Sequence, residues 1–508
     1  MAHAIMVVGT SSNVGKSAIC TALCKILVDA GYRVAPFKAQ NMSLNAAVTP
    51  KGAEIGRAQA VQAEACGIEP NEHMNPVLLK PTAFNASQVV LQGQVYGTKT
   101  TESYFREQRQ AIWAKVEESY RALEQRFDVI VIEGAGSPVE INLKEHDIAN
   151  MRVADMADAD VILVADIDRG GVFASVVGTL ALLSPAERAR VKGVIVNKFR
   201  GNANLFAEGV RMLEELAGVP VLGVVPYVLD IGIDEEDSLG LAGDRYSQPE
   251  GAGENLLQIG VVQVPHISNF NDFDPLFAVP GVSVRFCQRP QDLAGCHAVI
   301  LPGTKNTIED LRWLQERGFF APIWHAFAGG AAIVGICGGY QMLGIEVEDP
   351  FGVESGERWS SGLHLLPVRT VMAQNKATYQ AEGETTLYSG IHVSGYEIHM
   401  GETLPLVGTR PFAQITRRGE GVRRDDGAVW HAGRVVGTYL HGVFDNDAFR
   451  KAWLQSIRGR FRLETSTRGE RSFRERRWDA ICRFADVVRA NIDTATVRTW
   501  VEQRASNG

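Results

Sequence analysis

The feature that most constrains the fold is a series of six short apolar runs in the first half of the chain. The runs cover residues 4–8, 33–37, 129–132, 161–165, 191–196 and 221–225. They are rich in Val and Ile and show little polar alternation, as strands do when both faces of a parallel sheet are covered. Helical stretches such as 16–30 and 101–125 lie between them. This pattern predicts a doubly wound α/β domain.

Polar residues and glycine follow the ends of these apolar runs. The residues at those positions are Gly9, Lys38, Glu133, Asp166 with Asp168, Asn197 and Pro226. Ligands of open α/β sheets bind beyond the carboxyl ends of the strands. Because several separate segments deliver polar groups to one rim, we expect a ligand site there.

Length and a change of composition divide the chain. A chain of 508 residues is too long for one core. The stretch 247–255 is polar and rich in Gly and Pro, as linkers are. Beyond it, further apolar runs predict a second doubly wound, mostly parallel α/β domain, and after Asp447 the chain becomes helical. These runs cover 259–264, 298–301, 332–336 and 435–439. The expected division is a first domain at 1–246, a linker at 247–256, a second domain at 257–447 and a helical extension at 448–508.

The overall composition and net charge limit the classes of molecule that the protein is expected to bind. Hydrophobic residues make up 45% of the chain and charged residues 22%, which is ordinary for a globular protein. The formal net charge of −8 argues against a nucleic-acid partner. Seven cysteines without a CxxC pair argue against a zinc site or a disulfide framework. With no signal peptide and no apolar run of membrane-spanning length, we expect a cytoplasmic protein that acts on small molecules. The oligomeric state stays open.

The segment 9–17, GTSSNVGKS, joins the first apolar run to a helical stretch. Such a loop points backbone N–H groups at phosphates, so it predicts ATP binding. The phosphate-binding candidates are Gly9, Thr10, Gly15, Lys16 and Ser17. Lys16 would neutralise the phosphates and the Ser17 hydroxyl would ligate Mg²⁺. An ordinary strand–turn–helix connection is the simpler alternative.

The spacing of this loop, with five residues between its glycines, resembles the dethiobiotin synthetase-like branch of P-loop proteins. That resemblance implies that Glu133 is a second Mg²⁺ ligand, although a carboxylate stabilised by a helix dipole would look the same. It also implies that Lys38 faces the carboxylate being activated and that Asn197 reads the adenine. Ser11 stands where that family has an aspartate. Metal binding would therefore depend more on Ser17 and Glu133, and another acidic residue could supply a further ligand.

A second motif, GICGGYQ at 335–341, follows the apolar run 332–336. A cysteine at a strand end followed by two glycines has the form of a nucleophile elbow, which exposes the nucleophile and leaves N–H groups for an oxyanion. The string resembles class I glutamine amidotransferases. The resemblance implies that Cys337 attacks the side-chain amide of glutamine, giving a thioester and ammonia. A buried structural cysteine is the alternative.

The same resemblance assigns further residues around Cys337. His441, in GTYLHGVF, matches the family's catalytic base, but Val443 stands where most members have a glutamate. We therefore expect a Cys–His dyad whose orienting group is unassigned. The resemblance also implies that Gly303 and Gly338 supply oxyanion-hole N–H groups and that Gln341 contacts the substrate glutamine. Glu397 and His399 share a strand face by parity and are placed near the glutamine or corrin site.

Longer segments resemble the cobyric acid synthase family over nearly the whole chain. They are 36–46, 56–81, 166–171 and 302–307. The resemblance implies that four carboxylates (b, d, e and g) of adenosylcobyrinate a,c-diamide are amidated to adenosylcobyrate, with ATP activating each carboxylate as an acyl phosphate. Lys38, Gln40, Asn41 and Ser43 are the expected corrin contacts. A capped surface loop is the alternative for 36–46.

Two other functions remain open from the sequence. One is a cobyrinate a,c-diamide synthase-like amidotransferase, and the other is a regulatory P-loop ATPase with an inactive glutaminase domain. Release of glutamate from glutamine would separate the latter from an enzyme. The arginine-rich segment 458–477 is expected to be a solvated helix, with Arg474, Arg476 and Arg477 pairing with nearby glutamates on the surface.

Overall fold

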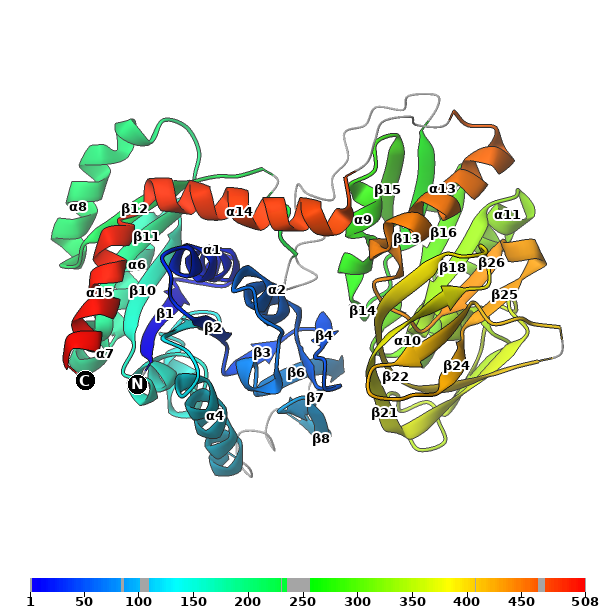
Figure 1. Ribbon diagram of the computed structural model, residues 1–508, viewed down its shortest axis with the longest axis horizontal. Helices are drawn as coiled ribbons and strands as arrows, with labels where there is room; N and C mark the ends of the chain where they lie inside the picture. The colour runs from blue at the N-terminus through cyan, green and yellow to red at the C-terminus, as the bar shows by residue number, and fades with distance from the viewer. Residues whose placement is uncertain are drawn as a thin grey trace.

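Two α/β domains lie side by side in the computed structural model (Figure 1). The structure describes residues 2–83, 86–100, 109–229, 231–234, 256–406, 408–464 and 471–507. The expected linker at 247–256 lies outside the described residues except for its last position. Among the described residues, no helix combines the length and the apolar character needed to cross a bilayer.

The first domain is built on a six-stranded sheet in the order β12-β11-β10-β1-β9-β2, and all neighbouring strands are parallel. Its strands are β1 (His3–Gly9), β2 (Val34–Phe37), β9 (Val129–Glu133), β10 (Asp160–Asp166), β11 (Val191–Phe199) and β12 (Val221–Pro226). Every residue of β1 and β9 is buried. Each of the six predicted apolar runs forms one of these strands, and the prediction of a doubly wound fold is confirmed.

Helices cover both faces of this sheet. The helices of the first domain are α1 (Lys16–Asp29), α2 (Arg57–Ala65), α4 (Arg109–Glu124), α5 (Met151–Met156), α6 (Val172–Leu182), α7 (Pro185–Arg190) and α8 (Ala207–Ala217). Residues of α1 pack on one face and residues of α4, α6 and α8 on the other. The predicted helix at 101–125 is described only from Arg109 onward, and 101–108 lies outside the described residues.

A small inserted sheet stands between the first domain's main sheet and the second domain (Figure 1). Its order is β3-β6-β7-β8, and a two-stranded ribbon of β4 and β5 accompanies it. The strands are β3 (Gln40–Met42), β4 (Ala46–Val48), β5 (Glu54–Gly56), β6 (Val77–Ala83), β7 (Ala86–Leu91) and β8 (Gln94–Thr100). This insertion was not predicted. Because Asn41 and Ser43 are buried in it, the segment 36–46 is not a surface loop.

The second domain also has a six-stranded sheet, in the order β15-β13-β16-β18-β26-β25, in which only β25 and β26 are antiparallel. Its strands are β13 (Leu257–Val262), β15 (Val282–Cys287), β16 (Ala298–Leu301), β18 (Ala332–Ile336), β25 (Ala428–Trp430) and β26 (Val435–Thr438). The helices around it are α9 (Asp274–Phe277), α10 (Thr307–Glu316), α11 (Phe320–Ala328) and α12 (Gly338–Leu343). The predicted second mostly parallel domain is confirmed.

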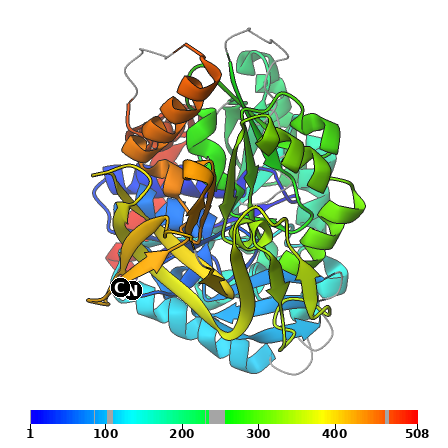
Figure 2. The same cartoon turned by 90° about the vertical axis from the view of Figure 1, so that its right-hand side faces the viewer.

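A sheet that is antiparallel except for the parallel pair β19 and β21 extends the second domain toward the first, around the long hairpin of β21 and β22, and Figure 2 shows it from the outer side of the domain. Its strands are β19 (Glu346–Glu348), β20 (Trp359–Ser361), β21 (Val368–Thr385), β22 (His392–Pro405), β23 (Ala413–Arg417) and β24 (Arg423–Asp426). A short pair, β14 (Ile267–Ser268) and β17 (Gly303–Thr304), lies at the edge of the main sheet.

The C-terminal helices join both domains. Helix α13 (Asp447–Phe461) packs in the core of the second domain through Trp453. Helix α14 (Phe473–Asn491) then crosses to the first domain (Figure 1), where Phe484 packs against residues of α1. Helix α15 (Thr494–Asn507) ends near the start of β1. The expected helical extension therefore packs against both domains and connects them. We call the helices α13, α14 and α15 the C-terminal clasp.

The prediction that the arginine segment 458–477 is solvated is wrong at three positions. Arg458, on α13, is buried and donates to the carbonyls of Gly281 and Glu464. The Arg477 side chain is only 17% exposed and pairs with Glu64 at 2.6 Å. Arg476 donates to the carbonyl of Ala278 in the second domain. Arg474 is exposed, as predicted. The arginines at 476 and 477 are half-buried because α14 crosses the domain boundary, where Ala278 of the second domain and Glu64 of the first supply acceptors.

Candidate active site

The phosphate loop lies between β1 and α1, at the carboxyl rim of the first sheet. Gly9 ends β1, the Thr10 N–H donates to the carbonyl of Val164 at 2.9 Å, and Gly15 caps α1. Lys16 Nζ lies across the loop and donates to the carbonyls of Ser11 and Gly136 at 3.0 Å each. The loop therefore has the rim position and the cation that phosphate binding needs.

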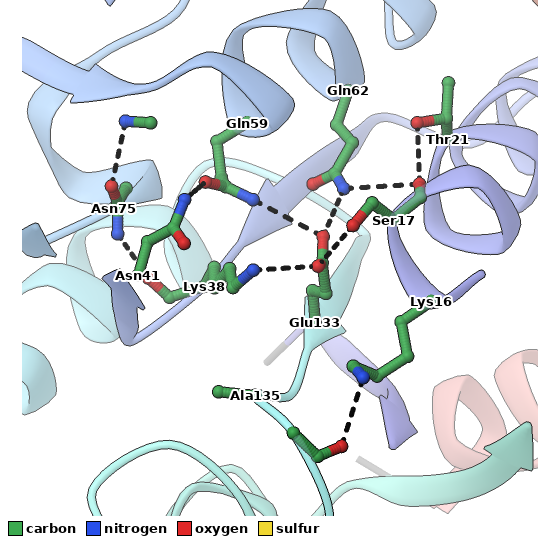
Figure 3. Close-up of polar contacts among 12 residues, drawn as sticks. Lys16, Ser17, Thr21, Lys38, Asn41, Gln59, Gln62, Asn75, Glu133 and Ala135 are labelled. Atoms are coloured by element: carbon green, nitrogen blue, oxygen red, sulfur yellow. Dashed lines mark hydrogen bonds and ion pairs between the residues drawn. The ribbon is translucent and has the colours of Figure 1, made fainter. Parts of the chain in front are cut away.

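Glu133 is the centre of a buried polar network below the loop (Figure 3). Its Oε1 accepts from Ser17 Oγ at 2.7 Å and from Lys38 Nζ at 2.9 Å. Its Oε2 accepts from Gln62 Nε2 at 2.6 Å and from Gln59 Nε2 at 3.4 Å. Burial opposes ionisation of Glu133, but the charge of Lys38 and these hydrogen bonds hold its pKa below the ordinary value. The structure thus brings three predicted residues together and adds two glutamines that no motif marks.

Ser17 and Glu133 form an oxygen donor set that suits Mg²⁺. Magnesium ions in nucleotide sites commonly take one or two protein oxygens and complete their shell with phosphate oxygens and water. Among the described residues, no cluster of three His, Cys, Asp or Glu could hold a metal by itself. Ser11, at the position of the missing aspartate, is exposed and donates to the neighbouring Ser12 carbonyl. The residues present therefore fit a metal held jointly with a nucleotide.

A cavity of about 550 Å³ opens beside the loop. Lys16, Lys38 and Asn41 line it on one side, and Tyr227 with Phe484 of α14 lines it on another. Asn197 also lines the cavity, but its Nδ2 donates to the carbonyl of Val14 at 2.8 Å and so braces the loop. Four of the six predicted ATP residues, Gly15, Lys16, Ser17 and Asn197, thus line one cavity, to which Phe484 of α14 contributes an aromatic side chain, whereas Gly9 and Thr10 do not line it.

The predicted corrin contacts lie next to this cavity. Asn41 Nδ2 donates to Gln59 Oε1 at 3.0 Å, and Ser43 Oγ accepts from the Asn45 N–H at 3.0 Å. Gln40 is half-buried in β3. The hydrogen bond from Asn41 connects this segment to the glutamines around Glu133.

Cys337 sits on a strained turn between β18 and α12, with φ 52° and ψ −111°. The turn packs against β16 so closely that a Cβ on Gly339 would lie 2.0 Å from the carbonyl oxygen of Leu301. Gly338 begins α12 directly after the cysteine. The thiol donates to the carbonyl of Ile398 at 3.3 Å. This is the geometry of a nucleophile elbow.

His441 is buried beside Cys337 and is oriented by Asp272. Its Nδ1 lies 2.7 Å from Asp272 Oδ2, while Asp272 Oδ1 accepts from the Gly442 N–H at 2.9 Å. Burial lowers the pKa of His441, but the charges of Asp272 and Cys337 and hydrogen bonds to both raise it to about 10. Sequence reasoning missed Asp272, which lies far upstream of the position where the family's glutamate was sought. The only signal was an acid among buried aromatic residues, which normally has a partner.

A small cavity of about 30 Å³ adjoins the cysteine and the histidine. Gln341 lines it and is held by Thr307 Oγ1 at 2.8 Å and by Tyr439 Oη at 3.2 Å. Gly303 packs against the imidazole, since a Cβ there would lie 2.9 Å from His441 Cε1. His399 lines this cavity too.

Glu397, predicted to lie near the glutamine or corrin site, makes two hydrogen bonds to Arg417, at 2.6 and 3.1 Å. Its carboxylate also lies 3.4 Å from His399 Nε2. Glu397 therefore binds side chains of the antiparallel sheet, and among the pair it is His399 that faces the cysteine's cavity.

The first domain supplies part of this cavity. Lys80, on β6 of the inserted sheet, lines it together with Lys376 of the second domain. Both lysines bind the buried carboxylate of Glu54, at 2.7 and 2.5 Å. Burial opposes ionisation of Glu54, but the two lysines lower its pKa to about 2. These residues carry no motif, so sequence reasoning could not identify them.

Comparison with protein families assigns a class to each half of the chain. Residues 5–239 match the CobQ/CobB/MinD/ParA nucleotide binding domain. Residues 258–449 match the CobB/CobQ-like glutamine amidotransferase domain. The fold and the two sites thus define a glutamine amidotransferase joined to a nucleotide-binding domain.

Close relatives narrow this class. The chain is 47% identical to the cobyric acid synthase of Syntrophobacter fumaroxidans, over 98% of each protein. It is 50% identical to that of Moorella thermoacetica, over 91% of this chain and 90% of the relative. It is 47% identical to that of Caldanaerobacter subterraneus, over 99% of both. The chain belongs to the cobyric acid synthase family and is an amide-forming enzyme, as the resemblance of its sequence predicted.

Proposed function

We propose that the enzyme amidates the b, d, e and g carboxylates of adenosylcobyrinate a,c-diamide to give adenosylcobyrate, using glutamine and ATP. The observation that carries this proposal is the presence, on one chain, of two complete sites. One contains Cys337, His441 and Asp272 in hydrogen-bond order, and the other contains the phosphate loop with Ser17 and Glu133. Together they provide ammonia and an activated carboxylate.

In the glutaminase site, Asp272 holds His441 with its proton on Nδ1, so that Nε2 takes the proton of the Cys337 thiol. The thiolate attacks the side-chain carbonyl carbon of glutamine. The N–H groups of Gly303 and Gly338 are proposed to stabilise the resulting oxyanion. The protonated His441 then gives its proton to the leaving nitrogen, ammonia departs, and water hydrolyses the thioester to glutamate. This triad replaces the dyad expected from the sequence.

In the first domain, a carboxylate oxygen of the corrin attacks the γ-phosphorus of ATP and ADP leaves. Lys16 neutralises the phosphates, and Lys38, which lines the same cavity, is proposed to orient the carboxylate. Mg²⁺, when held by Ser17 and Glu133, supplies further charge neutralisation on the phosphates. Ammonia then attacks the acyl carbon of the acyl phosphate, and phosphate leaves as the amide forms. Exclusion of water protects this intermediate from hydrolysis.

The corrin assignment rests on the family and on the segment beyond β2. Gln40, Asn41 and Ser43 offer neutral donors and acceptors beside Lys38, a combination that suits a macrocycle carrying both amides and carboxylates. The alternative substrate is cobyrinate itself, as for a cobyrinate a,c-diamide synthase.

The decisive experiment incubates the enzyme with ATP, Mg²⁺, glutamine labelled with ¹⁵N in its side-chain amide, and adenosylcobyrinate a,c-diamide. Mass spectrometry should show four successive conversions of carboxylate to labelled amide, with one glutamate released for each. If cobyrinate accepts two amides while the a,c-diamide accepts none, the enzyme is the diamide synthase. If glutamate is not released at all, the second domain is not a glutaminase.

A further inference from the structure

The cavity beside the phosphate loop is lined in part by the C-terminal clasp. Phe484 of α14 lines it, as do residues 226–229 and 231–234, which follow β12. The matched nucleotide-binding region ends at residue 239 and the matched glutamine amidotransferase region at residue 449. Phe484 therefore lies outside both family regions and still belongs to the lining of this cavity.

Helix α14 packs directly against the residues that follow β12. Gly232 has a left-handed backbone with φ 68°, and a Cβ built there would lie 2.8 Å from the Cβ of Ala480. Ile233 belongs to the same buried apolar cluster as Phe484. The cavity wall at 231–233 is therefore supported from behind by α14, with no room for a larger side chain at position 480.

A charged contact holds the end of the same wall. The carboxylate of Asp234, which lines the cavity, accepts from Arg57 Nε at 2.7 Å. Arg477 Nη1 of α14 lies 3.9 Å from the same carboxylate. The Asp234 side chain is only 3% exposed, so both cations stabilise it away from water. The clasp thus contacts residues 231–234 through both apolar and charged side chains.

The strand order indicates which end of a nucleotide reaches this wall. The phosphate loop follows β1 inside the sheet, and the expected corrin contacts at 38–43 follow β2 at one edge. Residues 226–234 follow β12 at the opposite edge. Ligands of such sheets lie along the carboxyl ends of the strands. If the γ-phosphate faces a carboxylate near Lys38, the base of the nucleotide extends toward β12.

The side chains at the β12 edge suit an apolar, planar base. Leu229 lines the cavity and is 71% exposed, and Tyr227 beside it is half-buried. Asn197, which was expected to read the adenine, uses its Nδ2 to brace the phosphate loop at the carbonyl of Val14. A base that covers Leu229 would remove apolar surface from water. Binding of the base therefore depends on this apolar wall.

We propose that α14 is part of the nucleotide site. The base and ribose of ATP lie against residues 226–234 and Phe484, while Ala480 and Arg477 hold residues 231–234 in position. The clasp therefore serves nucleotide binding as well as the connection between the domains. The choice of ATP as the nucleotide rests on the proposed function.

The test compares two ligands of the full chain in the presence of Mg²⁺, a non-hydrolysable ATP analogue and tripolyphosphate, which has no base. Ala480→Leu would displace Gly232 and should raise the Kd of the ATP analogue about tenfold in isothermal titration calorimetry, and Phe484→Leu should raise it about threefold. The Kd of tripolyphosphate should stay within about twofold, because the phosphate loop is unchanged. An unchanged Kd of the ATP analogue, or equal rises for both ligands, would overturn the proposal.

Val488→Ala is the matched control for destabilisation of the helix. Val488 is fully buried in the same cluster on α14 but does not line the cavity. This variant should lower the free energy of unfolding and leave the Kd of the ATP analogue within about twofold. A rise as large as that of Ala480→Leu would reject a specific role of the wall.

Two further outcomes separate this inference from the proposed function. If the wild-type enzyme binds the ATP analogue and the variants at 480 and 484 match it, the role of α14 fails and the proposed function stands. If those variants instead raise only the KM for the corrin, the corrin lies against α14 and the proposal is wrong. A wild-type enzyme that does not bind the ATP analogue would refute the proposed function and this inference with it.

Discussion

The two active sites occupy the same place in similar sheets and are built in different ways. The phosphate loop is one continuous segment, and its cavity of about 550 Å³ is open to a large ligand. The cysteine site has a cavity of about 30 Å³, and its wall includes Lys80 of the other domain. One cavity is therefore large and lined by several segments of the first domain together with Phe484 of α14, whereas the other is small and lined by residues of both domains.

This difference predicts which substitutions should impair only one of the two proposed functions. A substitution in the phosphate loop should affect the first cavity without changing the cysteine site. A site enclosed by the neighbouring domain should respond also to the contacts that hold the domains together. The following predictions test this distinction in order of expected effect.

Cys337→Ala should abolish glutamine-dependent amidation, because no other group can form the thioester. Loss of a nucleophile costs on the order of 10⁶-fold in rate. Amidation with ammonium salts should continue, since the phosphate loop is untouched. Steady-state rates with each nitrogen source measure this, and loss of both in a folded variant would falsify the division of labour.

Asp272→Asn should reduce glutamine-dependent kcat by on the order of 10⁴-fold, because His441 would lose the partner that fixes its tautomer. The ammonia-dependent rate should stay near that of the wild type. Equal losses with glutamine and with ammonia would instead mean that Asp272 only supports the fold.

Lys16→Ala should reduce amidation with either nitrogen source by on the order of 10³-fold, because one cation on the phosphates is lost. Basal glutamine hydrolysis should persist. Ammonia-dependent amidation near the wild-type rate would show that the phosphate loop is not the activating site.

Arg477→Met should lower the free energy of unfolding by about 1–3 kcal/mol, because Glu64 loses a charged partner that is only 17% exposed. Urea denaturation measures the change. Arg474→Met is the matched control on the same helix, and since Arg474 is exposed it should change stability by less than about 0.5 kcal/mol. Similar values for the two variants would mean that α14 does not clasp the domains.

Glu54 should make the contact between the domains sensitive to acid. Its pKa is lowered to about 2 from 4.5, so its stabilisation is complete above pH 4.5 and is lost as the pH falls through 2. The shift corresponds to roughly 3 kcal/mol. Denaturation of the wild type and of Glu54→Gln should show a difference at pH 7 that shrinks as the pH falls below 4.5. A difference independent of pH would exclude this role.

The sequence by itself determined the first main sheet, four of the six strands of the second and the backbone of each site, whereas β15 and β25 were not predicted. Short Val- and Ile-rich runs without polar alternation are typical of strands in a parallel sheet whose two faces are covered by helices. The six strands of the first sheet could therefore be located within residues 4–225. The phosphate loop and the cysteine elbow could be located because each is a local conformation that needs particular residues at fixed spacing. Neighbouring residues along the chain carry that information.

Only the tertiary structure decided which distant residues complete the sites. Asp272 reaches His441, Lys80 reaches the cysteine's cavity and Arg477 reaches Glu64 across long separations in sequence. A single buried charge can pair with any opposite charge that the fold brings near it. The sequence separation between the two partners is therefore not fixed, and the pairing cannot be predicted from the sequence. The inserted sheet supplies Lys80, the return of α14 supplies Arg477, and the helical turn Phe270–Phe273 of the second domain supplies Asp272, because an unpaired buried charge is too costly to leave.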